Sequence, residues 1–415
     1  MELHENEEQV QKAFLVSVDT GEYDAQLSLL ELIELTKSAG ATVECTMTQK
    51  RTAINKATCI GSGRLIELEN YCNENDIDLV IFDRELTPSQ IRNIEQNMDA
   101  RVIDRTMLIL DIFAQRAISK EGKLQVELAQ LKYLMPRLTG KGIALSRLGG
   151  GIGTRGPGET KLETDKRHIR RKMETIKEQM RDVQKHRNQI IKRREKDKVI
   201  TVAIVGYTNA GKSTLMNYLT DANVLAENKL FATLDLTSRA LKLPSGATVL
   251  LTDTVGLVRR LPHHLVDAFK STLEQAASAD VILNVCDASS DEAQLHLEVT
   301  RELLESLGAK ESPIISVLNK CDLVNGINDT VMIGNAIRIS AKDGQGIEEL
   351  LNAIDDNLPI KIKKVNLLIP FDKTSVVAQI RKQGTILKEE YNENGTVIEA
   401  LVEFDMLNQI SQYLV

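Results

Sequence analysis

Aromatic residues are scarce in this sequence. Its 415 residues include seven Phe, seven Tyr and no Trp. Single-stranded nucleic acid is usually bound by stacking its bases on aromatic rings, and cationic ligands are often held in aromatic cages. Neither kind of site is therefore expected.

Long apolar runs are also missing. No stretch approaches the roughly 18 apolar residues of a membrane-spanning helix. The start, MELHENEEQ, is acidic and has no apolar leader segment. The five cysteines are odd in number and contain no C-x-x-C pair, which supports neither a disulfide framework nor a zinc knuckle. We therefore expect a cytoplasmic protein without a membrane span.

The net charge of −7 hides a strong asymmetry. Residues 137–198 contain 19 Lys and Arg against 8 Asp and Glu, so the rest of the chain contains 33 against 51. A basic segment on an acidic protein indicates contact with a polyphosphate, most simply nucleic acid. The alternative is a solvated helix whose charges bind nothing specific.

The first 115 residues alternate apolar strands with amphipathic helices. Strands are expected at 13–18, 41–47, 78–83 and 100–104, with helices at 24–38, after Gly63 and from Pro88. This rhythm is typical of a small parallel α/β domain. We assign residues 1–115 to it.

Two apolar seams at heptad spacing follow. Leu124, Leu128, Leu131, Met135 and Leu138 form the first; Leu162, Ile169, Met173, Ile176, Met180, Val183 and Ile190 form the second. Each seam can be buried only against the other, which predicts an antiparallel helical hairpin over residues 116–198. The residues between the seams are too rich in glycine to be helical and form its tip loop.

The tip contains a G-x-G-x-x-G pattern at Gly151, Gly153 and Gly156. A dinucleotide site needs a strand before these glycines, and none is expected here. The loop also carries Lys141, Arg147 and Arg155, with no acid from Gly140 to Gly158. We interpret the glycines as allowing close approach to RNA, and the three cations as RNA contacts.

An apolar strand leads into Gly206-x-x-x-x-Gly211-Lys212-Ser213 and an amphipathic helix. This is a P-loop in its required context. Its backbone N–H groups are expected to surround the β-phosphate, with Lys212 between the β- and γ-oxygens and the Ser213 hydroxyl on Mg²⁺. The third domain is thus a P-loop GTPase domain over residues 199–360.

Further motifs follow in the order that a GTPase needs. Asp253 ends a strand, where it can reach Mg²⁺ through a water molecule. The Gly256 N–H can sense the γ-phosphate. Thr233 lies in the interval where a threonine reaches Mg²⁺ and the γ-phosphate. Lys212, Thr233 and Gly256 are the expected catalytic groups. Leu257 stands where a water-orienting glutamine is found in Ras-like proteins, so unaided hydrolysis should be slow and stimulated by a partner.

Guanine selection is predicted from two later motifs. Asn319-Lys320-Cys321-Asp322 supplies a carboxylate for the guanine N1–H and 2-amino group, and Ser340-Ala341-Lys342 supplies backbone and a lysine stem around the ring. Asn209 has two possible roles: a ligand of K⁺ beside the phosphates, or a side chain that stabilises the loop.

The residues expected to contact GTP are Gly206, Tyr207, Thr208, Asn209, Ala210, Gly211, Lys212, Ser213, Thr214, Phe231, Ala232, Thr233, Leu234, Asp235, Asp253, Thr254, Val255, Gly256, Asn319, Lys320, Cys321, Asp322, Ser340, Ala341 and Lys342. Residues 361–415 are predicted to form a small α+β domain and carry no motif that we can assign.

Several segments together resemble the HflX family of translation-factor-type GTPases over nearly the whole chain: GSGRL, GGGIGTRGPGETKLETD, GYTNAGKST, FATLD and DTVGLVRRLPHHLVDAFKSTLEQ. The resemblance implies a GTPase that binds the large ribosomal subunit and its rRNA and splits stalled or hibernating ribosomes, with the N-terminal domain and hairpin entering near the peptidyl-transferase centre. It implies GTP and GDP as ligands, Mg²⁺ as cofactor, partial association with ribosomes and no DNA partner. Two alternatives stay open: a ribosome assembly checkpoint factor, and a low-turnover module that senses nucleotide state.

Overall fold

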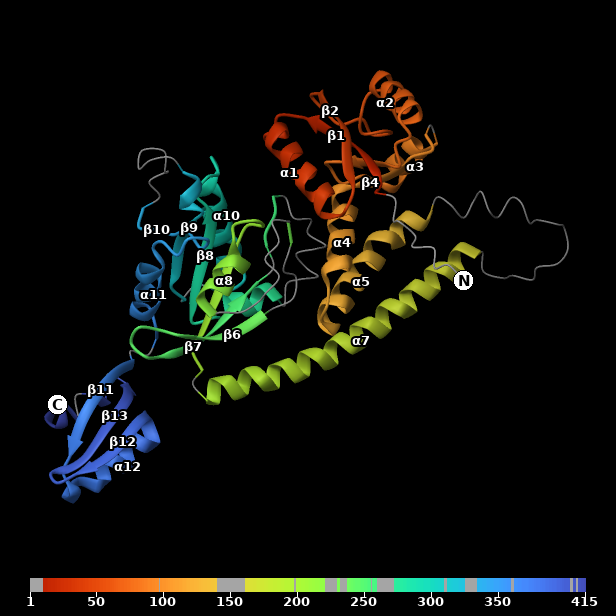
Figure 1. Cartoon of the computed structure of the whole chain (residues 1–415). Coiled ribbons are helices and arrows are strands. Elements are labelled where there is room, and N and C mark those ends of the chain that lie inside the picture. Colours follow the sequence, from red (N-terminus) through yellow and green to blue (C-terminus); the bar gives the residue numbers. More distant parts are fainter. Residues whose placement is uncertain are drawn as a thin grey trace, which may run out of the picture. The chain divides into compact units, whose positions relative to one another are not determined.

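The computed structural model describes residues 10–96, 98–139, 161–197, 199–220, 230–231, 237–254, 256–259, 272–309, 312–324, 334–359, 362–403, 406–407 and 410–415. The chain divides into two compact units (Figure 1). The first contains residues 1–191, 227–235 and 258–270; the second contains residues 192–226, 236–257 and 271–415. Two short segments from the middle of the GTPase motifs therefore belong to the first unit.

The first unit opens with a four-stranded parallel sheet of order β2-β1-β3-β4. Its strands are β1 Lys12–Asp19, β2 Thr42–Lys50, β3 Leu79–Phe82 and β4 Arg101–Asp104, and its helices are α1 Ala25–Ser38, α2 Ser62–Glu74, α3 Pro88–Glu95 and α4 Arg105–Arg116. Strand β1 is buried from Ala13 to Val18, as expected for an inner strand covered on both faces. The predicted parallel α/β fold is confirmed.

Short polar residues fix where these helices begin. The Asp24 side chain accepts from the Gln26 and Leu27 amides before α1. Thr87 and Gln90 form a capping box at α3, with Pro88 in its first turn. Since the first amides of a helix have no partner within it, each cap satisfies donors that would otherwise be unpaired.

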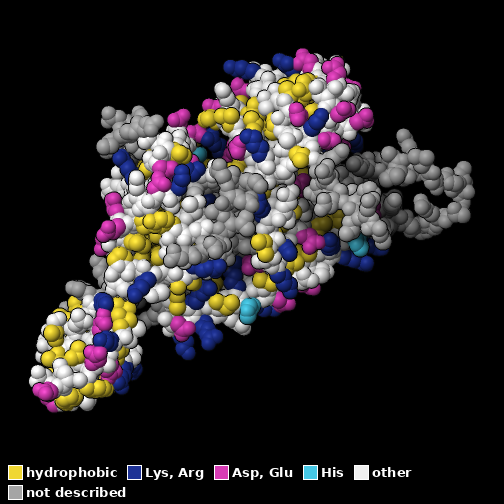
Figure 2. All heavy atoms as spheres, viewed as in Figure 1, with side chains coloured by type: hydrophobic (Ala, Val, Ile, Leu, Met, Phe, Trp, Pro, Cys, Tyr) yellow, Lys and Arg dark blue, Asp and Glu magenta, His cyan; other side chains and the backbone are white. Residues whose placement is uncertain are grey.

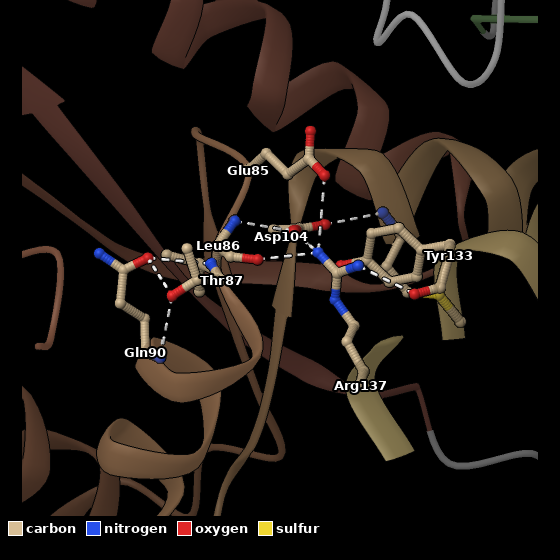
Figure 3. A network of polar contacts seen from close by, with 8 residues as sticks. Glu85, Leu86, Thr87, Gln90, Asp104, Tyr133 and Arg137 are labelled. Atoms are coloured by element: carbon tan, nitrogen blue, oxygen red, sulfur yellow. Dashed lines mark hydrogen bonds and ion pairs between the residues drawn. The ribbon is translucent and has the colours of Figure 1, made fainter. Parts of the chain in front are cut away.

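A buried polar network joins Asp104, which precedes α4, to Arg137 in the short 3-10 helix η1 Met135–Thr139 (Figure 3). The Asp104 carboxylate accepts from the Leu86 and Met107 amides, both at 2.9 Å. Arg137 donates to the Leu86 carbonyl at 2.8 Å and contacts Asp104 at 3.4 Å, while its guanidinium lies 3.4 Å from the centre of the Tyr133 ring. Burial raises the pKa of Asp104 above its usual value. Arg137 thereby anchors the residues that lead into the glycine-rich segment.

The middle region is helical: α5 Lys120–Leu134, the short 3-10 helix η1 Met135–Thr139 and α7 Lys161–Lys196. Leu124 and Leu128 of α5 pack against Met173 and Ile176 of α7. The ion pairs Glu121–Arg187 and Glu127–Lys172 run in opposite chain directions, so the two helices are antiparallel. Ile190 is 42% exposed, which ends the seam earlier than its spacing predicted. The predicted tip, with Lys141, Arg147 and Arg155, lies outside the described residues.

The second unit is built on a six-stranded sheet of order β10-β9-β8-β5-β7-β6, parallel except for β6 against β7. Its strands are β5 Thr201–Gly206, β6 Thr237–Lys242, β7 Thr248–Asp253, β8 Val281–Asp287, β9 Ile314–Asn319 and β10 Ile337–Arg338, and its helices are α8 Lys212–Thr220, α10 Ala293–Ser306 and α11 Ile347–Asp356. The P-loop strand β5 lies inside the sheet, so the strand ends beside it can supply side chains to one site.

The chain ends in a three-stranded antiparallel sheet of order β11-β13-β12 with one helix, which confirms the predicted α+β fold. The elements are β11 Ile362–Ile369, α12 Thr374–Gln383, β12 Thr385–Asn392 and β13 Gly395–Glu403. Leu367, Ile380 and Ile398 are fully buried in its core. In the part of the chain that the structure describes, no helix is both long and apolar enough to cross a bilayer.

Candidate nucleotide-binding site

The P-loop glycines are required by close packing. Gly206 has φ +150°, and a Cβ there would lie 2.0 Å from the Val285 carbonyl oxygen of β8. Gly211 has φ +84°, and its Cβ would lie 2.3 Å from the Asn319 side-chain nitrogen. A larger residue would strain the backbone and force the neighbouring strand or side chain away. The two glycines thus let the loop turn tightly between β5 and α8.

Lys212 begins α8 and is almost completely buried. Its ammonium donates to the Tyr207 carbonyl of the same loop at 2.7 Å. Burial lowers the pKa of Lys212 to about 8, although the charge of Asp253 opposes this shift. A buried ammonium held by a loop carbonyl can stabilise concentrated negative charge such as a polyphosphate.

Ser213 and Asp253 place two side-chain oxygens next to each other. Ser213 Oγ donates to Asp253 Oδ2 at 2.9 Å, and Asp253 Oδ1 accepts the Thr254 amide at 2.9 Å. Asp253 is fully buried at the end of β7. Hydroxyl and carboxylate oxygens are the ligands that Mg²⁺ prefers. Within the described residues, no group of three or more His, Cys, Asp or Glu could hold a metal ion.

The backbone after Asp253 is attached to the P-loop. A Cβ on Gly256 would lie 2.6 Å from the Thr208 methyl group and 3.1 Å from Lys212 Nζ. Leu257 donates to the Gly206 carbonyl at 3.1 Å and accepts from the Thr208 amide at 2.7 Å. The Leu257 side chain is apolar and buried. The polar contacts of this residue are therefore made by its backbone, with Gly206 and Thr208.

Asn319 connects the P-loop to the loop after β10. Its amide nitrogen donates to the Ala210 carbonyl at 2.8 Å, and its oxygen accepts the Ala341 amide at 2.9 Å. Both bonds are buried. One side chain thereby fixes the distance between the predicted phosphate-binding loop and the predicted guanine-binding loop.

Two further contacts orient the residues around Asn319. Ser340 Oγ donates to Asp322 Oδ1 at 2.8 Å, which holds the carboxylate on the side of the Ser340-Ala341-Lys342 loop. Lys320 has the left-handed φ of +64° and pairs with Asp287 at 2.8 Å. The structure thus brings four of the predicted motifs together at the ends of β5, β7, β9 and β10.

Other predicted residues stand apart from this cluster or are not described. Ala232, Thr233, Leu234, Asp235 and Val255 lie outside the described residues. Phe231 is described but belongs to the first unit, where it is buried against Phe113.

Sequence reasoning missed two residues beside the site. Asp287 at the end of β8 pairs with Lys320, and His296 of α10 stacks on Tyr207 with ring centres 3.8 Å apart. Neither lies in a motif, so no local spacing identified them.

Comparisons with known proteins agree along the chain. Models of protein families match residues 26–114 (described as GTP-binding GTPase N-terminal), 116–194 (GTP-binding GTPase Middle Region) and 201–320 (50S ribosome-binding GTPase). GTPase HflX of Caldanaerobacter subterraneus subsp. tengcongensis is 49% identical over 407 residues, which cover 98% of this chain and 94% of the relative. GTPase HflX of Escherichia coli K12 is 41% identical over 374 residues, covering 89% and 88%. A crystal structure of a GTP-binding protein from Sulfolobus solfataricus with GDP is 26% identical, covers 84% of this chain and 98% of its own, and has a TM-score of 0.46.

Binding of a nucleoside triphosphate should take up a proton at Lys212 in alkaline solution. Because the pKa of Lys212 is lowered to about 8, its charged fraction falls as the pH rises through that value, whereas bound phosphates favour the charged ammonium. Affinity should be constant well below pH 8 and weaken above it. Calorimetry at about pH 8.5 in two buffers of different ionisation enthalpy measures the uptake. Equal heats in both buffers would contradict this prediction.

Proposed function

The chain belongs to the HflX family of GTPases and is a GTP hydrolase, and from this premise we propose that it binds the large ribosomal subunit and splits stalled or hibernating ribosomes in a GTP-dependent manner. The observation that carries this proposal is the long helix α7. It extends for 36 residues with 14 Lys or Arg against 6 Asp or Glu. The description of the matching family model as 50S ribosome-binding supports the same partner.

The charge on α7 faces outward. Its exposed cations are Arg167, Arg170, Arg171, Lys172, Arg181, Lys185, Lys192, Arg193 and Lys196. Figure 2 shows dark blue side chains spaced along this helix. Among these cations, Lys172 pairs with Glu127 and Lys185 with Asp182. Over the whole helix, basic residues still outnumber acidic ones by 14 to 6. Phosphate contacts of this kind release counterions, so binding to rRNA should be strong and dependent on salt.

For the chemistry, we propose that Lys212 and the P-loop amides bind the β- and γ-phosphates. Ser213 and Thr233 would ligate Mg²⁺ directly and Asp253 through water; when bound, the ion offsets charge on the phosphate oxygens. The Gly256 amide would bind the γ-phosphate. Hydrolysis joins a water oxygen to the γ-phosphorus, breaks the bond to the bridging oxygen and releases GDP, inorganic phosphate and a proton.

Slow unaided hydrolysis is expected from Leu257. Its apolar side chain is buried and has no group that could orient the attacking water. Water placement must then depend on backbone groups and on a partner that completes the site. The ribosome is the partner that this proposal supplies.

For the base, we propose that Asp322 accepts from the guanine N1–H and 2-amino group, with the backbone of Ser340-Ala341-Lys342 at O6 and the Lys342 stem over the ring. Ser340 already fixes the carboxylate through its 2.8 Å hydrogen bond. Cys321 completes the motif without a predicted polar contact. Adenine lacks the pair of donors that this carboxylate requires.

Replacing Asp322 with Asn should weaken GTP binding about a hundredfold or more, because two charge-assisted hydrogen bonds to guanine are lost. Xanthosine triphosphate should become the better ligand, since its base presents a carbonyl to the new amide. Competition binding with both nucleotides measures the switch. Asp343→Asn is the matched control, because Asp343 also lies near Ser340, at 3.4 Å, but is not predicted to touch the base. Unchanged GTP affinity in Asp322→Asn would disprove the assignment.

Asn209 keeps its two interpretations. It is exposed and has the left-handed φ of +60°, a conformation that Asn tolerates better than most residues, which supports a role in shaping the loop. A K⁺ ligand beside the phosphates would instead offset charge that develops during hydrolysis. If K⁺ is bound, hydrolysis with ribosomes should be faster in KCl than in NaCl, and Asn209→Gly, which preserves the backbone, should remove the difference. Equal rates in both salts would leave only the structural role.

The ribosome proposal is tested at the glycine-rich segment. Replacing residues 141–156 with a Gly/Ser linker should leave GTP affinity intact, because the predicted nucleotide contacts all lie beyond residue 198, but should abolish splitting of 70S particles in sucrose gradients. Changing Lys141, Arg147 and Arg155 to Ala should flatten the salt dependence of subunit binding by roughly one unit of slope per lost contact. Changing Arg239, Lys242 and Lys388 to Ala is the control for lost charge.

The outcomes separate the rival functions. Normal splitting without residues 141–156 would refute the RNA contact. Subunit binding without splitting, in GTP and in a non-hydrolysable analogue alike, would favour the assembly checkpoint. Nucleotide-dependent binding with negligible turnover on ribosomes would favour the sensing module.

A further inference from the structure

The ring of Tyr207, in the P-loop, is covered by a histidine from another element. His296 of α10 stacks on it, with ring centres 3.8 Å apart and an angle of 20° between the ring planes. Tyr207 is 9% exposed and the His296 side chain is 13% exposed. Both residues belong to the second compact unit, as does Lys212. The stack is therefore a contact within the unit that contains the P-loop.

The backbone carbonyl of Tyr207 is the point to which the P-loop lysine is attached. It accepts from the Lys212 ammonium at 2.7 Å and from the Ala210 amide at 3.3 Å. A lysine side chain is flexible, so a fixed acceptor is needed to hold its ammonium in one place. The orientation of the peptide group between Tyr207 and Thr208 therefore sets where the charge of Lys212 lies.

The other neighbours of the Tyr207 ring are apolar. The ring belongs to a buried cluster that includes Val205, Leu257 and Leu273. Apolar contacts are non-directional, so they bury the ring without fixing the angle of its plane. A ring stacked face to face does restrict that angle, because rotation of either ring would separate the two faces. His296 is thus the contact that orients the Tyr207 side chain.

His296 is itself fixed on α10. Asn284 Nδ2 of β8 donates to the carbonyl of Leu297, the next residue of the helix, in a buried bond of 2.9 Å. At the edges of the imidazole, Nδ1 lies 4.0 Å from Cys286 Sγ, and Nε2 lies 3.9 Å from a carboxylate oxygen of Glu292. Burial raises the pKa of the Cys286 thiol to about 12, so this neighbour stays uncharged. The helix and the strand together present the His296 ring to Tyr207 in one orientation.

We propose that His296 is a positioning residue for phosphate binding by the P-loop. By stacking on Tyr207, it fixes the carbonyl that holds the Lys212 ammonium, and so places that charge for the β-phosphate of GTP or GDP. His296 acts through Tyr207 and is assigned no contact with the nucleotide. A binding group that is already in place loses less conformational entropy when the ligand arrives, which strengthens binding. The inference rests on the role proposed above for Lys212.

The test compares His296→Ala with His296→Phe, which keeps a flat ring against Tyr207 but loses both ring nitrogens. His296→Ala should weaken the binding of GTP and GDP about fivefold, an effect of the size that one ring pair contributes. His296→Leu, which fills most of the space without a flat face, should behave in the same way, and His296→Phe should recover most of the lost affinity. Gln294→Ala is the matched control. It shortens an exposed side chain of the same helix, whose amide donates to Glu298 at 2.9 Å, and should leave both affinities unchanged.

Binding of GMP separates positioning from a general loss of structure. GMP carries guanine and the α-phosphate but lacks the β-phosphate that Lys212 is proposed to bind. His296→Ala should therefore leave the dissociation constant of GMP unchanged in competition experiments at millimolar GMP, well below the unfolding midpoint of the variant. The ratio of the GMP constant to the GDP constant should fall about fivefold. An equal loss of affinity for GMP and GDP would show a structural role and overturn the inference.

Removing the ring on the other side of the stack completes a double-mutant cycle. Tyr207→Ala keeps the carbonyl but loses the stack, so it should bind GDP as weakly as the double variant with His296→Ala, because the second change has no ring left to release. Additive losses would overturn the inference, as would an affinity of His296→Ala for GDP equal to that of the parent. Parent protein without measurable binding of GTP or GDP would instead refute the proposed phosphate site itself.

Discussion

The buried side chain of Asn319 is the interaction on which the nucleotide site depends. Its amide donates to Ala210 in the P-loop and accepts from Ala341 in the loop after β10, so one planar group sets the spacing between two binding loops. Gly211 must lack a side chain for this approach to occur. Because a buried amide that loses one partner leaves another polar group unsatisfied, the three segments are energetically linked. The loops predicted to bind the phosphates and the base are therefore built as one structure.

Two short segments beside GTPase motifs belong to the first compact unit. Leu230–Phe231 and Val258–Arg259 pack with α1 and α4, while Asp253, Gly256 and Leu257 stay with the P-loop sheet. The boundary between the two compact units passes through the segments whose backbone a GTPase must place correctly.

The helical hairpin adds length and charge. Leu124 and Leu128 pack against Met173 and Ile176, which is enough to pair α5 with part of α7, and Arg137 secures the end of this region through Asp104 and Leu86. Along the rest of α7, the exposed surface carries Lys and Arg side chains. Apolar packing on one stripe and basic charge on the rest is the arrangement that a rigid, RNA-facing helix requires.

The sequence by itself determined the secondary structure and the local motifs. The alternation of strands and helices predicted the parallel α/β domain, the heptad spacing predicted the hairpin, and Gly206 to Ser213 predicted the P-loop. These succeed because each depends on residues adjacent in the chain: a helix face repeats every 3.6 residues, and a phosphate-binding turn needs its glycines at fixed positions. Tertiary structure alone decided that Ile190 leaves the seam, that Asp287 pairs with Lys320, and that Glu31 binds Arg259, 228 residues away. Such contacts follow from which distant segments the fold brings together within each unit, and no periodicity in a sequence encodes that choice.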